Sequence, residues 1–212
     1  MIIVGSGGFA KEIFDVFVVC KQEQELVFFN NIDPTATLFL NRFPIIHTDN
    51  EVVDYFQCRD RRFVLGIGGP QNREKLFNHF RALGGTPYSV IGCNAVVSSI
   101  DTNLGEGICF LNGCVVSAGS SIGNGCLVYY SANVTHDCVI GDFCEISPGA
   151  CVLGGATIGN RTHIGANATI LPKIRIGCDV RIGAGAVVTQ DIPDNTTAVG
   201  VPAVIIKHHH SN

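Results

Sequence analysis

The stretch NVTHDCVIGDFCEISPGACVLGGATIGNRTHIGANATI, residues 133–170, decides the fold because one pattern returns in it every six residues. A large apolar side chain occupies the same place in each hexad, and the rhythm continues on both sides of this stretch. The full column is Leu104, Phe110, Val116, Ile122, Val128, Val134, Ile140, Ile146, Val152, Ile158, Ile164, Ile170, Ile176, Ile182 and Val188. In a chain with 46% hydrophobic residues, such a run has a chance of about 10⁻⁵.

A second column, four residues after the first, holds mostly small side chains. Its members are Cys114, Ser120, Cys126, Ala132, Cys138, Cys144, Ala150, Ala156, Thr162, Ala168 and Ala186. One large and one small residue per hexad suits a narrow three-sided coil, in which the large residue fills the axis and the small one lets backbone pass close. The four cysteines of this column are therefore predicted to be buried packing residues.

A period of eighteen residues is superimposed on the hexads. The glycines at positions 105, 123, 141, 159 and 177 each follow a residue of the large column, so one turn of the coil is three hexads. We expect these glycines to take corner torsions that a Cβ disfavours. About five turns stacked ~4.8 Å apart make a prism about 24 Å tall. Such a prism has little concavity, which places binding sites between neighbouring copies and predicts an oligomer.

Residues 1–87 have a different character and are expected to form a small Rossmann-like α/β domain, followed by the repeat domain, residues 88–212. The predicted elements are a strand at 1–4, a glycine loop at 5–12, a helix at 12–22, strands at 26–31 and 63–69, and a helix that begins near Pro70 and ends at Gly84 and Gly85. Free N–H groups at the glycine loop favour a phosphate. The glycines do not have the GxGxxG spacing of a dinucleotide-binding loop, and the acidic residue expected about twenty positions on is missing. The loop is therefore explained equally well as a structural turn or as a phosphate site.

The composition argues against several classes of function. The net charge is −4 with 15% charged residues and no basic run, so nucleic acid is not an expected partner. Neither a signal peptide nor an apolar run of membrane-spanning length is present. Ten cysteines without a CxxC pair are interpreted as reduced thiols of a cytoplasmic protein. The tail His208, His209 and His210 is interpreted as a terminal feature or part of a purification tag, in preference to a metal site.

The repeat resembles the hexapeptide acyltransferases in its [LIV]-G-x-x-[small]-x pattern over residues 90–205, which ends in GVPAVIIK at 200–207. That resemblance implies a left-handed parallel β-helix and a homotrimer, whereas the general rule for parallel crossovers gives a right-handed coil. A narrower resemblance spans almost the whole chain. GSGGFAK (5–11), FFNN (28–31), GIGGPQNREKLF (66–77) and VTHDCVIGDF (134–143) resemble the sialic acid O-acetyltransferase and nucleotide-amino-sugar N-acetyltransferase subgroup of the PglD and NeuD type.

The resemblance implies an acetyl-CoA-dependent N-acetyltransferase that acts on a nucleotide-linked amino sugar and requires no metal. The N-terminal domain then holds the acceptor. By motif position, the acceptor contacts are Gly8, Phe9, Ala10, Asn30, Asn31 and Gly68. Relatives often have carboxylates where Asn30 and Asn31 stand, and this departure affects any contact there that needs a charge.

His136 is the candidate general base. An amine that attacks a thioester must give up a proton, and a neutral imidazole accepts one near pH 7. His136 stands two residues after the inward-facing Val134, so its side chain is expected to project outward, and Asp137 follows it. The spacing alone allows two interpretations of His136 and Asp137: they form a catalytic pair, or they are a surface His beside a surface Asp. The resemblance assigns the base to His136, with Asp137 orienting the ring or raising its basicity.

Acetyl-CoA contacts are also implied by the resemblance. The subgroup often has a second His nine residues after the base, where this chain has Glu145. A carboxylate accepts a hydrogen bond, but it cannot donate one as the N–H of a neutral histidine does. Ala166 and Ala184 match positions that bind acetyl-CoA in the subgroup, where small side chains let its pantetheine arm lie along the coil. Both alanines are equally explained as tight corners.

Two other functions stay open, and a third is disfavoured by the positions of the histidines. O-acetylation of a sugar such as sialic acid uses the same base. A non-catalytic trimeric β-helix scaffold needs no base. A carbonic-anhydrase-like zinc site needs convergent histidines, but His136 and His163 lie 27 residues apart, which is one and a half turns and places them on different faces.

Overall fold

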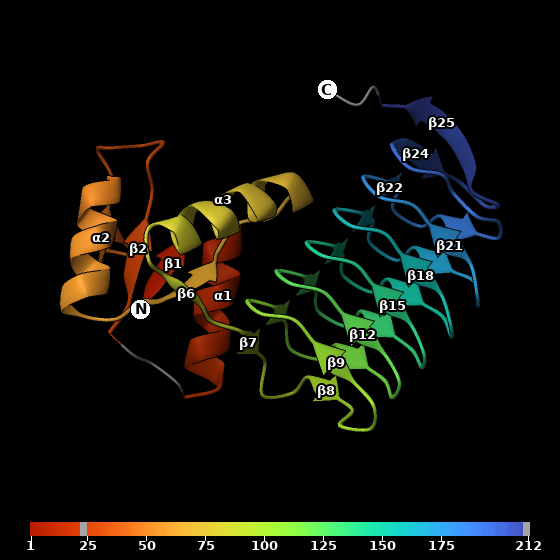
Figure 1. The fold of residues 1–212 in the computed structure, drawn as a ribbon, viewed down its shortest axis with the longest axis horizontal. Coiled ribbons are helices and arrows are strands. Elements are labelled where there is room, and N and C mark those ends of the chain that lie inside the picture. Colours follow the sequence, from red (N-terminus) through yellow and green to blue (C-terminus); the bar gives the residue numbers. More distant parts are fainter. Residues whose placement is uncertain (22–24, 210–212) are drawn as a thin grey trace.

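The computed structural model describes residues 1–21 and 25–209. His210 lies outside the described residues. The structure confirms an α/β N-terminal Rossmann-like domain followed by a left-handed parallel β-helix (Figure 1). The chain passes from the sheet to the coil between β6 and β7, at residues 88–89.

Over its described residues, the N-terminal domain is a six-stranded sheet with three helices. Its elements are β1 (Ile2–Val4), α1 (Gly8–Val19), β2 (Val27–Phe29), β3 (Leu38–Phe39), β4 (Phe43–Ile46), α2 (Asp49–Cys58), β5 (Arg62–Leu65), α3 (Pro70–Ala82) and β6 (Thr86–Pro87). The strand order is β3-β4-β2-β1-β5-β6, and only the β3–β4 pair is antiparallel. The apolar IIV run makes β1 the fully buried central strand. Because the chain adds strands first on one side of β1 and then on the other, a crevice forms at the carboxyl ends of β1 and β5.

Two parts of this domain differ from the sequence prediction. Helix α1 begins at Gly8, four residues before the predicted start, because Gly7 already has the extended torsions of an N-cap. The sequence predicts no helix or strand over residues 32–61, yet this segment contains β3, β4 and α2. The sequence does carry a signal for α2, a capping box in which Glu51 N donates to Thr48 Oγ1 and Thr48 N donates to Glu51 Oε2.

The coil has three faces, each a stack of short strands. The first face contains β7 (Val90–Ile91), β10 (Cys109–Phe110), β13 (Leu127–Val128), β16 (Glu145–Ile146), β19 (His163–Ile164), β22 (Arg181–Ile182), β24 (Thr196–Val199) and β25 (Val204–His208). The second face contains β8 (Val96–Val97), β11 (Val115–Val116), β14 (Asn133–Val134), β17 (Cys151–Val152), β20 (Thr169–Ile170) and β23 (Val187–Val188). The third face contains β9 (Asn103–Leu104), β12 (Ser121–Ile122), β15 (Val139–Ile140), β18 (Thr157–Ile158) and β21 (Arg175–Ile176). Between β9 and β23, parallel neighbours pair residues eighteen positions apart, such as Glu145 with His163. At the two ends of the coil the spacing changes: β7–β10 and β8–β11 pair residues nineteen positions apart, and β22–β24 pairs residues sixteen positions apart.

The large column fills the axis of the coil, as predicted, and the apolar members of the small column belong to the same buried cluster. From Phe110 to Val188 every member of the large column is at most 3% exposed, and the small column is completely buried. Leu104 is the exception at 39%, because β9 is the end strand of the third face and has a neighbour on one side only. The four cysteines are buried packing residues, and burial raises the pKa of the Cys114 thiol to about 12.

The repeated glycines have a different cause from the one expected. Positive φ angles occur at every sixth residue from Asp101 to Gly185, including Asp137, and not at the glycines that follow the large column. Those glycines allow close stacking instead. A Cβ on Gly159 would lie 2.6 Å from Gly177 C and from Cys178 N in the next turn. The backbones of successive turns approach too closely at this corner for any side chain.

The close approach predicts the effect of Gly159→Ala. We expect its free energy of unfolding to fall by about 1–3 kcal/mol or more, because the methyl group would force the coils apart. Thermal or denaturant unfolding followed by circular dichroism measures this. Gly8→Ala is the matched control, since no atom lies within 4 Å of its added Cβ and it should not be destabilised. Equal stability of the two variants would show that the coils do not require this spacing.

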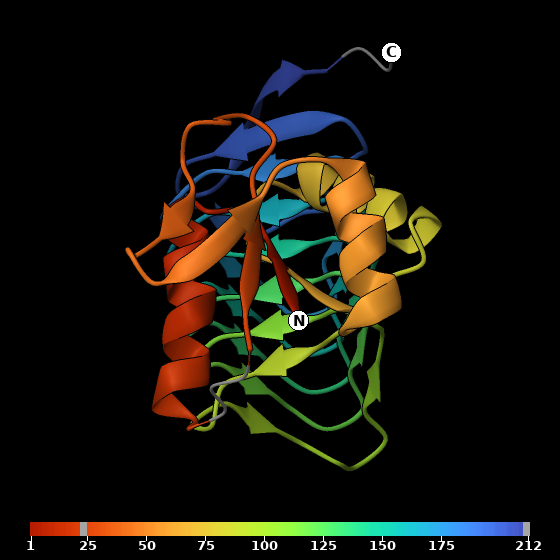
Figure 2. The ribbon, with the colours of Figure 1, turned by 90° about the vertical axis from the view of Figure 1, so that its left-hand side faces the viewer.

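The N-terminal domain packs on the first face of the coil. Ala10, Ile13 and Phe17 of α1 share one apolar cluster with Val90 and Leu127. Figure 2 views the molecule from the N-terminal domain and shows α1 and α2 on opposite sides of its sheet, with the coil behind them. Of the helices in the described ranges, none has the length and apolar character needed to cross a membrane.

Candidate active site

A pocket of about 610 Å³ opens at the carboxyl ends of β1, β2 and β5. Its lining residues are Val4, Gly5, Ser6, Gly7, Gly8, Phe9, Phe29, Asn30, Asn31, Ile32, Asp33, Ala36, Gly66, Ile67, Gly68 and Leu76. The volume is within the range of small-molecule and cofactor sites. The N-terminus of α1 opens onto it with no side-chain cap and no acidic residue in the first turn, which leaves free N–H groups for an anionic ligand.

The glycine loop has its shape because two backbones approach closely. Gly5 has φ +116°, and a Cβ there would lie 2.7 Å from Gly66 O and from Ile67 Cγ2. The turn between β1 and α1 therefore touches the end of β5. This contact sets the width of the pocket.

Most predicted acceptor contacts line this pocket, and Ala10 does not. Gly8, Phe9, Asn30, Asn31 and Gly68 are all in the lining. The Ala10 side chain is completely buried beneath the pocket, and a Cβ on Gly66 would lie 3.2 Å from it.

Asn30 shapes the pocket wall. Its Nδ2 donates to Ser6 Oγ at 2.8 Å, and its Oδ1 accepts from Ile32 N at 2.9 Å and from Asp33 N at 3.2 Å. One amide therefore ties the glycine loop to the turn after β2, which a carboxylate could not do with both a donor and an acceptor. Sequence reasoning missed Ser6 and Asp33 as lining residues, although the NNIDP run at 30–34 has the composition of a turn.

His136 projects outward at the corner between the second and third faces, as expected. Its side chain is 69% exposed, and Nδ1 lies 2.8 Å from Asp137 Oδ2. A carboxylate only accepts, so Nδ1 carries the proton and Nε2 is left as the acceptor. The ring lies over Gly154, where a Cβ would be 2.6 Å from Nε2. The absence of a side chain at Gly154 makes room for the imidazole.

Glu145 lies on the first face of the coil, against the N-terminal domain. Its side chain is 12% exposed, and Oε2 accepts from Gly69 N at 2.8 Å. Oε1 is 3.9 Å from His163 Nε2, which is itself 2.8 Å from Ser147 Oγ. The carboxylate is therefore beside the pocket rim at Gly68.

Ala166 and Ala184 stack at the corner between the first and second faces, where Gly185 N donates to Ala166 O at 2.8 Å. Ala166 is half-buried and Ala184 is exposed. His136 is at a different corner of the coil. Within a single chain, Glu145 lies beside the pocket, whereas the two alanines and His136 occupy two different corners of the coil. Across the described ranges, no group of three or more His, Cys, Asp or Glu side chains could hold a metal ion.

Comparisons with known proteins agree with this architecture. The family model of the PglD N-terminal domain matches residues 1–80, and that of the bacterial transferase hexapeptide (six repeats) matches residues 137–172. No curated protein matches the chain.

Solved structures match over nearly the full length. PerB from Caulobacter crescentus, in complex with CoA and GDP-perosamine, is 33% identical with a TM-score of 0.88, covering 97% of this chain and 96% of that one. The acetyltransferase domain of PglB from Neisseria gonorrhoeae, in complex with acetyl coenzyme A, is 31% identical with a TM-score of 0.88, covering 97% and 98%. WeeI from Acinetobacter baumannii is 27% identical with a TM-score of 0.87, covering 97% and 98%.

Proposed function

The chain belongs to the PglD-like sugar N-acetyltransferases of the hexapeptide-repeat acyltransferases, and we propose that it transfers the acetyl group of acetyl-CoA to the amino group of a nucleotide-linked amino sugar. One observation carries this proposal. Over 97% of its length the chain matches the fold of PerB, which was crystallised with CoA and GDP-perosamine, and its own N-terminal domain has a glycine-lined pocket beside the hexapeptide coil.

Residues 1–87 hold the acceptor. The 610 Å³ pocket is large enough for a nucleotide, and the free N–H groups of the α1 N-terminus suit its phosphates. Gly8, Phe9, Asn30, Asn31 and Gly68 form the walls. Ala10 supports the pocket from below. The sugar then extends past Gly68 toward the coil, residues 88–212, which carries the chemistry.

His136 acts as the general base. The amino nitrogen of the acceptor attacks the thioester carbonyl and loses a proton to Nε2. Asp137 Oδ2 accepts the Nδ1–H at 2.8 Å and stabilises the imidazolium that forms. When the C–S bond breaks, the imidazolium returns the proton to the CoA sulfur, so the products are the amide and CoA. General-base catalysis of this kind contributes about 10²–10⁴ to the rate.

The complete site requires more than one copy of the chain. Ala166 and Ala184 would lie along the pantetheine arm of acetyl-CoA, and Glu145 on the adjoining first face would also contact acetyl-CoA. His136 occupies a different corner of the coil. A homotrimer brings the corner of one coil to the first face of the next. Acetyl-CoA and reduced cysteines are compatible with a cytoplasmic enzyme.

The test is a mass-shift assay with the purified protein, acetyl-CoA, and a panel of UDP-, GDP- and dTDP-linked amino sugars together with sialic acids. At least one nucleotide amino sugar should gain the mass of one acetyl group, and a sugar without a free amine should gain none. Acetylation of sialic acids alone would replace N-transfer with O-transfer. No transfer to any member of the panel would support a scaffold.

A further inference from the structure

Arg73 of α3 is a fully buried cation. None of its surface is exposed, and no ion pair found among the described residues includes it. Burying a guanidinium is unfavourable unless its N–H groups are hydrogen-bonded, and an apolar side chain of similar volume often packs as well or better. The presence of a charge here therefore has to be explained by the contacts that it makes.

The guanidinium joins the pocket wall to the coil. Nη1 donates to Ile67 O at 2.8 Å and to Leu65 O at 3.3 Å, where β5 ends. Nε donates to Gly125 O at 2.9 Å, at a corner of the coil. Because the guanidinium is planar and its donors have fixed directions, these contacts set the distance between the two parts.

The same wall segment is held a second time, two residues further along. Gly69 N donates to Glu145 Oε2 at 2.8 Å. Gly68 lies between the two contacts, and a Cβ on it would be 3.5 Å from Glu145 Oε2. A cation thus holds the carbonyl of Ile67 and a carboxylate holds the N–H of Gly69. The segment that lines the pocket is fixed to the coil at both ends.

Movement of this segment would change the pocket. Gly66 O would be 2.7 Å from a Cβ on Gly5, so the two walls already touch. The coil end of the link is firmly packed, because the Phe143 ring lies against Gly125 and its centroid is 5.2 Å from that of Phe77. Displacement is therefore expected on the pocket side of Arg73.

We propose that Arg73 is a positioning residue for the acceptor: through Ile67 and Gly68 it fixes the pocket at one height above the coil, and so sets where the sugar amine lies. It touches no reacting atom itself. The identity of the acceptor rests on the proposed function, whereas the link between Arg73 and the pocket wall does not.

The test compares Arg73→Met and Arg73→Lys with the wild type in steady-state kinetics for both substrates. In Arg73→Met the KM for the acceptor should rise about tenfold or more, since small misplacements cost much at a positioned site. The KM for acetyl-CoA should stay within about twofold. Arg73→Lys keeps the charge but loses the planar guanidinium with its several N–H donors. Its KM for the acceptor should therefore lie between those of the wild type and Arg73→Met. Affinities for UDP, GDP and dTDP, measured by calorimetry, should weaken in the same order.

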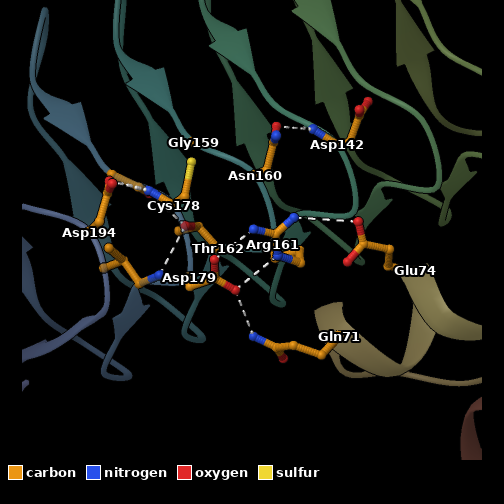
Figure 3. Close-up of polar contacts among 12 residues, drawn as sticks. Gln71, Glu74, Asp142, Gly159, Asn160, Arg161, Thr162, Cys178, Asp179 and Asp194 are labelled. Atoms are coloured by element: carbon orange, nitrogen blue, oxygen red, sulfur yellow. Dashed lines mark hydrogen bonds and ion pairs between the residues drawn. The ribbon is translucent and has the colours of Figure 1, made fainter. Parts of the chain in front are cut away.

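Arg161→Met is the matched control. Arg161 also links the coil to α3, with Nη1 3.4 Å from Glu74 Oε1 and Nη2 2.7 Å from Asp179 Oδ2 (Figure 3). Among the described residues, none of the hydrogen bonds and ion pairs of its side chain reaches residues 65–69. Arg161→Met, like Arg73→Met, removes an arginine side chain from the junction between α3 and the coil. Both KM values should stay within about twofold of the wild type.

Several results would overturn the positioning role. An unchanged acceptor KM in a folded Arg73 variant would do so, as would equal effects of Arg73→Met and Arg161→Met on both KM values. If Arg73→Met does not fold, Arg73→Lys decides by the same criterion. If the wild type acetylates no panel member, the proposed function is wrong, but the role of Arg73 is still tested. The affinities of the wild type and the Arg73 variants for UDP, GDP and dTDP then decide it. A wild type that binds none of the three nucleotides contradicts both.

Discussion

Replacing His136 with alanine is expected to lower kcat by about 10²–10⁴, the range typical for loss of a general base. The imidazole is exposed and contacts Asp137, so its removal leaves the axis of the coil intact and should change neither the oligomeric state nor the thermal midpoint. Steady-state rates at saturating acceptor and acetyl-CoA, with gel filtration alongside, measure the effect.

His79→Ala is the control for this variant. In the part of the chain that the structure describes, His79 forms the other exposed His–Asp pair, with Nε2 2.9 Å from Asp49 Oδ1, but it lies on α3 and outside the pocket lining. It should keep the wild-type rate. A His136→Ala enzyme with unchanged kcat would remove the imidazole from the mechanism and leave positioning and backbone donors as the source of catalysis.

Two inactive variants are expected to restore activity when they assemble together. His136→Ala removes the base but keeps the pocket. Gly8→Trp keeps the base but fills the pocket, since Gly8 lines it and no atom lies within 4 Å of an added Cβ. Each homotrimer should be nearly inactive. In the proposed trimer, every assembly that contains both variants has one interface of its three that combines an intact pocket with an intact imidazole, so its rate per site should be about a third of the wild-type rate.

Co-expression with two different affinity tags isolates the mixed trimers, and their rate per site is compared with that of the wild type. A mixture as inactive as its parents would show that pocket and imidazole act within one chain. That result would contradict the shared site, although it would leave the fold unaffected.

The coil was predictable because its rule is local and repeated. Each hexad places one large and one small side chain on the axis, so Ile146 and Ala150, which are both completely buried, could be assigned from the sequence. The outward direction of His136 followed from its distance to Val134. The helix at 70–82 was equally visible, since Pro70 and Gly84 mark its two ends.

The sequence did not reveal contacts between residues far apart in the chain. Gly159 is required because Cys178 lies one turn below it, which becomes visible only when the turns stack. Arg73 reads as a surface residue of an amphipathic helix until Gly125 is placed beside it. The sequence indicates only an acetyl-CoA contact for Glu145, because nothing in it links this residue to Gly69, which is 76 residues away.

We expect a nucleotide sugar held by one chain to present its amine to the His136 imidazole of another. A crystal structure with CoA and an accepted nucleotide amino sugar would show this arrangement. The amine nitrogen should then lie within about 2.6–3.2 Å of Nε2 of His136 from a neighbouring copy, beside the CoA sulfur. An amine that lies against Glu145 and His163 of its own chain, with every His136 remote, would contradict this expectation.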